Sequence, residues 1–476
     1  MKVLYCTSEA TPFAATGGLA EVSGSLPQAL RLRLIGCRVV MPLYEDIPQE
    51  LRENMKFVTS LSVPVAWRRQ YCGIFETHVG GVIFYLIDNQ YYFKRHGLYG
   101  HYDDAERFAF FSRAAIEMLP YIDFKPDIIH CNDWQTALVP IYYSLFYADN
   151  DRYKGIKTVF TIHNIQYQGK YGKELIEDVL GIPKESTPLL EYGGCVNLLK
   201  GAVECANRVT TVSPTYAQEI LDPWYAYGLE GILQERRWKL SGILNGIDVN
   251  VYNPETDPDI DAPYSAEDIA DKAQNKLGLQ KRLGLAQKED VPLVGMVTRM
   301  VPHKGLDLVK ETLDRMMQET EIQFVILGSG DWEYENYFKE MQGRYPGRLC
   351  ACFGFVPELS HKIYAASDIF LMPSKTEPCG LAQMIALRYG TVPVVRETGG
   401  LHDSVQDSGD GKGNGFTFKT YDSGDMFFAM TRALKGYSRP EGWRVLVRRA
   451  MECDFSWGRS ANEYIRLYRD LLKNGQ

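Results

Sequence analysis

The chain has 476 residues, which is enough for two large domains or about three of average size. Hydrophobic residues make up 45% and charged residues 24%, an ordinary globular composition that excludes disordered, collagen-like and coiled-coil proteins. There are 52 Lys and Arg against 60 Asp and Glu, a net charge of −8, so we expect no nucleic-acid partner.

The sequence gives no sign of a membrane or secretory segment. Apolar runs stay well short of the ~18 residues that a membrane helix needs, and the first apolar run meets Thr7-Ser8-Glu9 too early for a signal peptide. The ten cysteines are scattered, with no C-x-x-C pair. We therefore expect a cytoplasmic protein with free thiols and no membrane partner.

Short β-branched runs alternate with helix-like stretches along the chain. The expected strands are Val3–Cys6, Val39–Met41, Asp127–Cys131, Thr158–Ile162, Leu293–Val297, Phe324–Leu327, Asp368–Met372 and Thr391–Val395. Such alternation indicates parallel sheets covered by helices on both faces, the α/β class. Residues 57–87 interrupt the pattern, and we interpret them as an antiparallel insertion at one edge of the first sheet.

A turn-rich segment at 252–258, just after Asn245-Gly246, places a domain boundary near residue 244. The tetrapeptide Thr16–Leu19 recurs as Thr398–Leu401, one copy in each half and each beyond an expected strand. Open α/β sheets bind ligands at this end of their strands, so the pattern suits two Rossmann-like domains that face one cleft. Paired glycines are also common in turns that bind nothing.

Two cations follow an expected strand of the second half. Arg299 ends the strand and Lys304 opens the next helix, so both can bind one diphosphate. The alternative is a solvated Arg and a Lys at a helix start, a position that the helix dipole disfavours for a cation. The unfavourable position favours an anion ligand.

Other polar residues also follow expected strands. Glu377 follows Asp368–Met372, where a carboxylate can bind sugar hydroxyls or stabilise positive charge as a glycosidic bond breaks, or simply cap a helix. His163 ends an expected strand of the first half, whereas His130 lies inside an expected strand and is predicted to be a core residue. Trp134 and several tyrosines of the first half suit either carbohydrate binding or the core.

Taken together, these motifs resemble bacterial glycogen synthases and plant starch synthases, glycosyltransferase family 5. The matching segments, in chain order, are Thr16–Val22, Asp133-Trp134, His163-Asn164, Tyr227–Gly231, Leu244–Asp248, Arg299–Asp307, Glu377–Leu381 and Thr398–Leu401. They span nearly the whole chain, and their order is far more specific than any one of them.

The resemblance implies a GT-B fold, in which two Rossmann-like doubly wound domains face a cleft and a C-terminal helix crosses back to the first domain. Residues 1–243, completed by 456–476, would form the acceptor-side domain, and residues 244–455 the nucleotide-sugar domain. The implied activity is a retaining hexosyl transfer from ADP-glucose to the non-reducing end of an α-1,4-glucan such as glycogen. No metal and no cofactor are expected.

The resemblance also implies roles for single residues. The expected catalytic residues are Glu377, His163, Arg299 and Lys304. The expected donor-binding residues are Gly18, Asn245, Phe355, Cys379, Gly380, Leu381, Thr398, Gly399 and Gly400. Asp133, Trp134 and Asn164 would contact glucose or the acceptor. The sequence departs from the family at Ala15, where Lys is frequent, and at Glu21, where Asp is frequent.

Two rival readings keep the fold. One is a related glycosyltransferase that uses UDP-glucose or another acceptor, which the loss of the Lys at Ala15 favours. The other is a glucan-binding protein without activity, which the intact Arg299, Lys304, His163 and Glu377 disfavour. An NAD-dependent oxidoreductase is disfavoured because no G-x-G-x-x-G follows the first strand.

Overall fold

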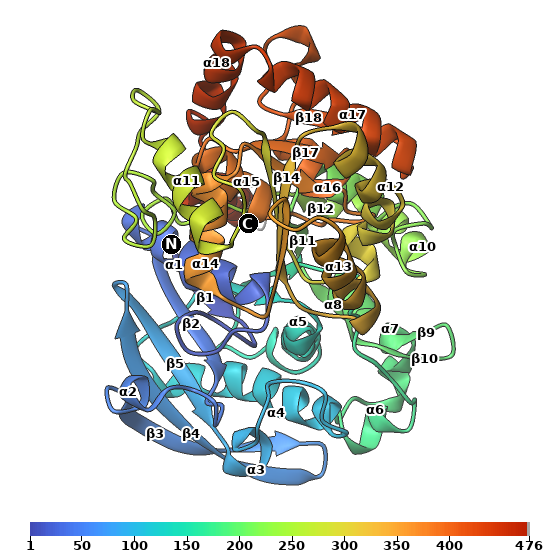
Figure 1. Ribbon diagram of the computed structural model, residues 1–476. Helices are drawn as coiled ribbons and strands as arrows, with labels where there is room; N and C mark the ends of the chain where they lie inside the picture. The colour runs from blue at the N-terminus through green and yellow to red at the C-terminus, as the bar shows by residue number, and fades with distance from the viewer. Residues whose placement is uncertain (474–476) are drawn as a thin grey trace. The chain divides into compact units, whose positions relative to one another are not determined.

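The computed structural model describes residues 1–473 and divides into two compact units. Unit 1 contains Met1–Asn245 and the C-terminal segment from Trp457 onward, and unit 2 contains Gly246–Ser456. Both are α/β units, as Figure 1 shows by the central strands and the helices around them. The expected α/β class is confirmed. The division falls after residues 245 and 456, next to the expected boundaries at 243 and 455.

Unit 1 is built on a nine-stranded sheet. Its strands, in spatial order, are β12 (Leu240–Gly242), β11 (Arg208–Thr211), β7 (Lys157–Ile162), β6 (Ile128–Asn132), β1 (Lys2–Cys6), β2 (Gly36–Pro42), β5 (Val82–Asp88), β4 (Arg68–Val79) and β3 (Lys56–Val65). From β12 to β5 every neighbouring pair is parallel. Residues Val3–Cys6 are completely buried, because helices cover both faces of a parallel sheet.

The expected insertion at 57–87 is confirmed. Strand β4 pairs antiparallel with both β3 and β5, and β3 forms the edge of the sheet. These long strands are drawn in blue in Figure 1. The turn Ala66-Trp67 joins β3 to β4, with Ala66 at a positive φ of 52°. The insertion thus extends one edge of the sheet and leaves the parallel strands intact.

Helices surround this sheet. They are α1 (Gly18–Leu32), α2 (Gln49–Arg52), α3 (Gln90–Phe93), α4 (Asp104–Glu117), α5 (Leu138–Tyr142), α6 (Leu175–Asp178), α7 (Thr187–Leu190), α8 (Leu198–Cys205), α9 (Pro214–Glu219), α10 (Glu230–Glu235) and α19 (Trp457–Lys473). The segment between β7 and β11 also forms a small antiparallel sheet. Its strands, in spatial order, are β8 (Lys170–Tyr171), β10 (Cys195–Asn197) and β9 (Glu191–Tyr192).

The C-terminal helix α19 belongs to unit 1, as the resemblance implied. It packs on α1, and Arg33 Nε donates a hydrogen bond of 2.8 Å to Asn462 Oδ1. Deeper in the core, Tyr468 Oη lies 2.6 Å from His130 Nδ1, and Thr161 Oγ1 lies 2.6 Å from His130 Nε2. His130 is completely buried with both ring nitrogens satisfied, so its expected role as a core residue is confirmed.

Unit 2 contains a six-stranded parallel sheet. Its strands, in spatial order, are β15 (Leu349–Phe353), β14 (Gln323–Gly328), β13 (Leu293–Val297), β16 (Ile369–Met372), β17 (Val392–Arg396) and β18 (Phe416–Phe418). Its helices are α11 (Lys272–Arg282), α12 (Leu306–Glu319), α13 (Trp332–Arg344), α14 (Pro357–Ala366), α15 (Ala382–Arg388), α16 (Gly399–Ser404), α17 (Ser423–Tyr437) and α18 (Pro440–Met451). All four strands expected in this half are present, with bounds that differ by at most one residue.

All ten cysteines, which lie within the described residues, are free thiols, as expected. In the part of the chain that the structure describes, no helix combines the length and the apolar character needed to cross a membrane.

The bond between Tyr468 and His130 gives a test of how α19 is anchored. Tyr468→Phe leaves the buried Nδ1 of His130 without a partner, which is expected to lower the free energy of unfolding by about 1–3 kcal/mol. Urea denaturation of the full chain measures this change. The control Asn462→Ala removes an exposed hydrogen bond on the same helix and is expected to cost less than about 0.5 kcal/mol. Equal losses in the two variants would contradict the anchoring role of Tyr468.

Candidate active site

In unit 2 the expected site residues follow three neighbouring strands. Arg299 and Lys304 follow β13, Glu377 follows β16, and Thr398 follows β17. These strands are adjacent and parallel, so their carboxyl ends lie at the same edge of the sheet. The sheet therefore gathers residues that are up to 99 positions apart in sequence, the separation of Arg299 and Thr398. Such an edge is the usual ligand-binding side of an open α/β sheet.

An ion pair joins two of these loops. Lys304 Nζ lies 2.7 Å from Glu377 Oε2, and Ser374 Oγ donates to the same oxygen at 2.9 Å. Both charged side chains are largely buried, with 14% and 8% of their surfaces exposed. Lys304 and Glu377 are thereby fixed close together at the strand ends. Among the described residues, no hydrogen bond or ion pair uses the second oxygen of Glu377, Oε1.

Arg299 differs from Lys304 in its surroundings. Its side chain is exposed, and among the described residues no hydrogen bond or ion pair holds its guanidinium. Between the two cations, burial and the charge of Lys304 lower the pKa of His303 to about 4, with a smaller contribution from Arg299. His303 is therefore neutral at pH 7. The positive charge of this loop comes from Arg299 and Lys304, and that of Arg299 is free to meet an anion.

Glycines allow two of the loops to touch. A Cβ on Gly399, which has a φ of +44°, would lie 2.0 Å from the Glu377 carbonyl oxygen, and one on Gly400 would lie 1.9 Å from that of Cys379. The Gly400 N–H donates to the Glu377 carbonyl at 3.1 Å. Only glycine permits this approach of two backbones. The turn that contains Thr398, Gly399 and Gly400 thus packs directly on the loop that carries Glu377.

The side chain of Gln383 holds the same loop by hydrogen bonds. Gln383 Nε2 donates to the carbonyl oxygens of Cys379 at 3.1 Å and Gly380 at 2.8 Å. It also donates to Ser404 Oγ at 3.0 Å. Gly380 has a positive φ of 72°, and a Cβ there would lie 2.5 Å from Gln383 Oε1. Cys379, Gly380 and the following Leu381 are therefore held in one conformation.

Phe355 lies away from the ion pair, just beyond the edge strand β15. Its side chain is 92% exposed, which is extreme for a phenylalanine. It follows Gly354, whose φ of +114° turns the chain after the strand. The ring is thus available to stack on a planar ligand group.

In unit 1 the expected residues also follow neighbouring strands, β6 and β7. Asp133 Oδ1 accepts a hydrogen bond of 2.7 Å from the His163 N–H. Burial raises the pKa of Asp133 to about 7, although backbone N–H groups of His163 and Asn164 oppose this change. Asp133 itself has a positive φ of 56°, an unusual conformation for a residue other than glycine. It is a strained, desolvated carboxyl group at a strand end.

The tautomer of His163 follows from its neighbours. Burial lowers the pKa of His163 to about 3, so the ring is neutral at pH 7. Its Nε2 lies 2.9 Å from Asn132 Oδ1, which also accepts from the Tyr5 hydroxyl. Because Asn132 Nδ2 donates to the Cys6 carbonyl, Oδ1 is the acceptor and Nε2 carries the proton. The Nδ1 of His163 keeps a lone pair that accepts a hydrogen bond from a hydroxyl group.

Aromatic rings hold Trp134 in place beside Asp133. Its ring centroid lies 5.2 Å from that of Phe108 and 6.0 Å from that of Tyr171. A Cβ on Gly169, which has a φ of +63°, would lie 2.9 Å from the indole ring. Trp134 is half-buried, so one part of the ring is packed and another is accessible.

Glu9 is a site residue that the sequence analysis missed. It is 4% exposed, and its Oε2 accepts hydrogen bonds from the N–H of Thr16 at 2.5 Å and from the Thr16 hydroxyl at 2.9 Å. Burial raises its pKa. Glu9 therefore fixes the loop that leads to Gly18, the first residue of the 15-residue helix α1. The position of Glu9 just beyond the first expected strand is the sequence signal from which its role could have been predicted.

Asn164 and Asn245 complete the expected set in unit 1. Asn164 Oδ1 accepts from the Gln166 N–H at 3.0 Å, which leaves its Nδ2 group for other partners. Asn245 is 5% exposed, and its Oδ1 has no hydrogen-bond partner among the described residues. A buried amide oxygen without a hydrogen-bond partner lowers the free energy of unfolding unless a ligand or water donates a hydrogen bond to it.

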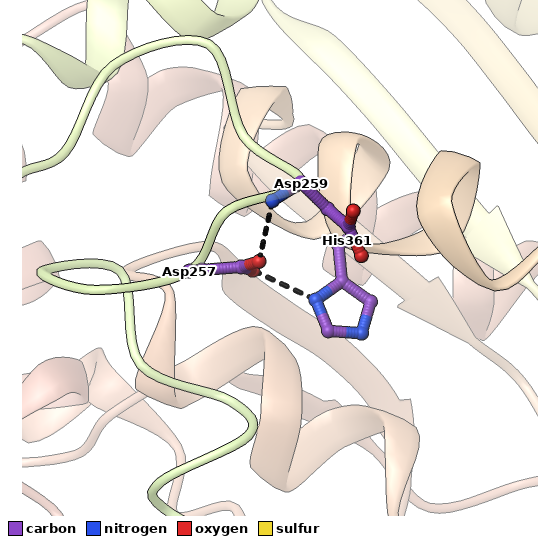
Figure 2. Close-up of side chains that lie close together, drawn as sticks. All are labelled: Asp257, Asp259 and His361. Carbon is purple, nitrogen blue, oxygen red and sulfur yellow. Dashed lines mark hydrogen bonds and ion pairs between the residues drawn. The ribbon is translucent and has the colours of Figure 1, made fainter.

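A cluster of possible metal ligands lies elsewhere in unit 2. Figure 2 shows Asp257, Asp259 and His361, whose ligand atoms all lie within 4.8 Å of one another. Asp257 accepts from His361 Nδ1 at 2.7 Å, from the Asp259 N–H at 2.9 Å and from the Tyr389 hydroxyl. These bonds use both carboxylate oxygens of Asp257. We interpret the cluster as a structural network that joins the 257–259 turn to α14.

Comparison with known proteins gives matches over nearly the whole chain. The family model of the starch synthase catalytic domain matches residues 2–235, and that of glycosyl transferases group 1 matches residues 280–445. The chain is 51% identical to the glycogen synthase of Geobacillus thermodenitrificans (strain NG80-2), over 99% of this chain and 98% of that protein. It is 49% identical to the glycogen synthase of Alkaliphilus metalliredigens (strain QYMF), over 99% of this chain and 100% of that protein.

Solved structures give the same result. The catalytic domain of starch synthase IV from Arabidopsis thaliana, bound to ADP and acarbose, is 37% identical with a TM-score of 0.90, over 99% of both chains. Sucrose-phosphate synthase from Thermosynechococcus elongatus, at 18% identity and a TM-score of 0.63 over 99% of both chains, shares the fold.

Two Rossmann-like units with charged and glycine-rich loops at the carboxyl ends of their strands define a GT-B glycosyltransferase. Within this class, the chain belongs to the family of bacterial glycogen synthases and plant starch synthases. It is a hexosyltransferase that extends a glucan from a nucleotide-sugar donor.

The raised pKa of Asp133 predicts a pH dependence of stability. In the unfolded chain an Asp titrates near ~3.9, whereas in the fold the pKa is about 7. Between these values the folded state binds more protons than the unfolded chain. The contribution of Asp133 to the free energy of unfolding is therefore full below pH ~4 and is lost as the pH rises through 7. Asp133→Asn has no carboxyl group to titrate, so the variant does not lose stability in this way. Relative to wild type, its free energy of unfolding is expected to increase from pH ~4 to 7, by at most ~1.4 kcal/mol per pH unit.

Urea denaturation of both proteins at several pH values measures this difference. His163 contributes to the free energy of unfolding in the opposite sense, because its contribution is lost as the pH falls from ~6.5 toward 3. This contribution is the same in both proteins and cancels in the difference. A difference that stays constant across the window would contradict the raised pKa of Asp133.

Proposed function

We propose that the chain transfers glucose from ADP-glucose, with retention of configuration, to the 4-hydroxyl at the non-reducing end of an α-1,4-glucan. In this proposal unit 2 binds the nucleotide sugar and unit 1 binds the acceptor. The free thiols suit a reducing compartment, and we assign the reaction to the cytoplasm.

The observation that carries this proposal is the cation arrangement beyond β13. Lys304 is fixed by Glu377 at 2.7 Å, and Arg299 stands beside it with a guanidinium that no described residue neutralises. A departing diphosphate needs concentrated positive charge when its bond to glucose breaks. Arg299 and Lys304 provide that charge, and the neutral His303 between them avoids further repulsion.

Backbone groups assist the cations. The turn at Thr398–Gly400 is held against the loop at Cys379–Leu381 and shapes it, and we assign the N–H groups of Gly380 and Leu381 to the donor phosphates and sugar. Gly18 opens helix α1, where side chains leave open space around the backbone and a helix N-terminus attracts negative charge.

Glu377 and His163 act on the transferred glucose. As the bond to diphosphate breaks, positive charge develops at the anomeric carbon, and the Glu377 carboxylate stabilises it. The lone pair on His163 Nδ1 accepts a hydrogen bond from a glucose hydroxyl. Asp133, Trp134 and Asn164 supply hydrogen bonds and a stacking surface for glucose or the acceptor chain.

Retention of configuration follows from reaction on one face of the sugar. The bond between the anomeric carbon and the diphosphate oxygen breaks, and the acceptor 4-hydroxyl oxygen attacks from the same side. That hydroxyl gives its proton to the leaving diphosphate oxygen. The protein side chains take no proton in this step; they stabilise charge and orient both substrates.

The assignment of ADP-glucose has two supports. Phe355 exposes a ring beyond β15, where it can flank a nucleobase, and Asn245 offers a buried amide oxygen without a partner among the described residues. The Arabidopsis relative at 37% identity was solved with ADP. The first support fits any nucleobase, so the second favours adenine over uracil.

Parallel assays with ADP-glucose and UDP-glucose, with glycogen as acceptor and with and without EDTA, test the proposal. A strong preference for ADP-glucose that survives EDTA is expected. A preference for UDP-glucose would overturn the donor assignment and direct attention to Ala15 and Glu21 in the loop before α1. Absence of transfer from either donor, with glycogen still bound, would overturn the catalytic assignment.

Replacement of Arg299 tests the charge argument. Arg299→Ala removes a group that stabilises the leaving diphosphate, and kcat is expected to fall by about 10²–10³-fold, as when an oxyanion-hole donor is lost. The control Arg344→Ala removes an exposed arginine of the same unit that pairs with Asp314, and full activity is expected. Turnover of Arg299→Ala close to wild type would remove Arg299 from the catalytic set.

A further inference from the structure

Two thiols face each other on the edge strand of unit 2. Cys350 and Cys352 are two residues apart on β15, so their side chains lie on the same face of the sheet. The two Sγ atoms are 3.8 Å apart. Both side chains are half-buried, which leaves them accessible to small molecules. The thiols of Cys6 and Cys131 are also in contact, but both residues are completely buried, so Cys350 and Cys352 are the accessible pair of the two.

The surroundings of the pair favour the thiolate form of one member. The contact between the two thiols and the positive charge of Arg282 lower the pKa of Cys352, against the effect of burial. The same contact and burial raise the pKa of Cys350. The pair also packs against an apolar cluster that includes Leu279 and Leu285. The positive charge of Arg282 favours Cys352 as the attacking thiolate, and Cys350, with its Sγ 3.8 Å away, is the neighbouring thiol that can resolve the oxidised form.

We propose that Cys350 and Cys352 form a redox-modification site, at which hydrogen peroxide converts the dithiol to a disulfide within β15. The Cys352 thiolate attacks a peroxide oxygen, breaks the O–O bond and becomes a sulfenic acid, while the leaving oxygen is released as water. The Cys350 sulfur then attacks the Cys352 sulfur and releases the sulfenic oxygen as a second water. Two electrons pass from the sulfurs to one peroxide, and hydrogen peroxide yields two waters.

The disulfide would change the shape of the strand. Residues i and i+2 of an extended strand have Cα atoms ~6.6 Å apart, near the upper end of the ~4.4–6.8 Å found across disulfides. Closing the bond therefore shortens this stretch of β15. Because β15 forms the sheet edge, shortening disturbs only its pairs with β14, in which Cys350 lies opposite Val325 and Cys352 opposite Leu327.

Phe355 follows the dithiol by three residues, through Phe353 and Gly354. Movement at the end of β15 would displace the exposed ring that we assign to the nucleobase. This functional consequence rests on the proposed donor role of Phe355, whereas the formation of the disulfide does not. The two parts of the inference are therefore tested separately.

The chemical test uses the full wild-type chain and hydrogen peroxide. After peroxide treatment, alkylation of remaining thiols and trypsin cleavage, the peptide 349–362 contains Cys350 and Cys352 and no other cysteine. The expected product is this peptide without alkylation and lighter by two hydrogens. Dithiothreitol before alkylation is expected to restore two alkylation sites.

Two controls show whether the oxidation is specific to the pair. Cys195 is a half-buried thiol in the peptide 185–200, and is expected to remain alkylated under conditions that oxidise the pair. Cys350→Ser is expected to trap Cys352 as a sulfenic acid that reacts with dimedone. Two alkylated cysteines in the wild-type peptide after peroxide, or oxidation of Cys195 at the same rate, would overturn the proposed site.

The functional test compares donor KM before and after oxidation. Oxidised wild type is expected to show a KM for ADP-glucose raised about fivefold, the effect of losing one base-stacking contact, with reversal by dithiothreitol. The double variant Cys350→Ser/Cys352→Ser is expected to keep its KM in peroxide. If Phe355→Ala leaves KM unchanged, the donor role of Phe355 fails; if it raises KM while oxidation does not, the coupling of the dithiol to the donor site fails.

Discussion

The ion pair between Lys304 and Glu377 determines how the loops at the carboxyl ends of the unit 2 strands are arranged. It joins the loop after β13 to the loop after β16, and the glycine contact at Gly399 and Gly400 then joins the loop after β17 to the same place. Breaking such a largely buried pair by removing one partner typically costs about 3–5 kcal/mol, because the other charge is left uncompensated. The pair thus fixes the loops in place and, in the proposed function, is part of the charge distribution that the donor diphosphate meets.

Unit 1 uses a different principle, the desolvation of titratable groups. Burial raises the pKa of Asp133 and lowers that of His163, so at neutral pH one is close to its midpoint and the other is neutral. These groups offer hydrogen bonds rather than strong fixed charges, which suits a sugar. The fixed cations lie in unit 2, which suits a phosphate. The difference in charge between the two sets of loops agrees with the proposed function, in which unit 2 binds the nucleotide sugar and unit 1 binds the glucan acceptor.

The sequence predicted the central strands well because each is a continuous apolar run that is buried on both faces. It missed β11, β12, β15 and β18 in the two large sheets. These strands have at most five residues each and carry weaker patterns, and β12, β15 and β18 form sheet edges. Glu9 and Gln383 were also missed, because their roles depend on which backbone groups the fold brings to them. Roles for Phe355 and Asn245 came from the family resemblance alone, since neither lies in a pattern that indicates chemistry.

Helix α19 has a consequence for the order in which the chain is completed during synthesis. Unit 1 contains residues 1–245, yet it needs α19, which follows unit 2 in the sequence, to satisfy His130 in its core. Unit 2 is continuous in sequence, so all of its strands leave the ribosome before α19 does. Domains generally fold as units during translation. The N-terminal half of this enzyme is therefore the later of the two to reach its final packing, and a truncated message would yield a finished C-terminal unit attached to an unfinished N-terminal one.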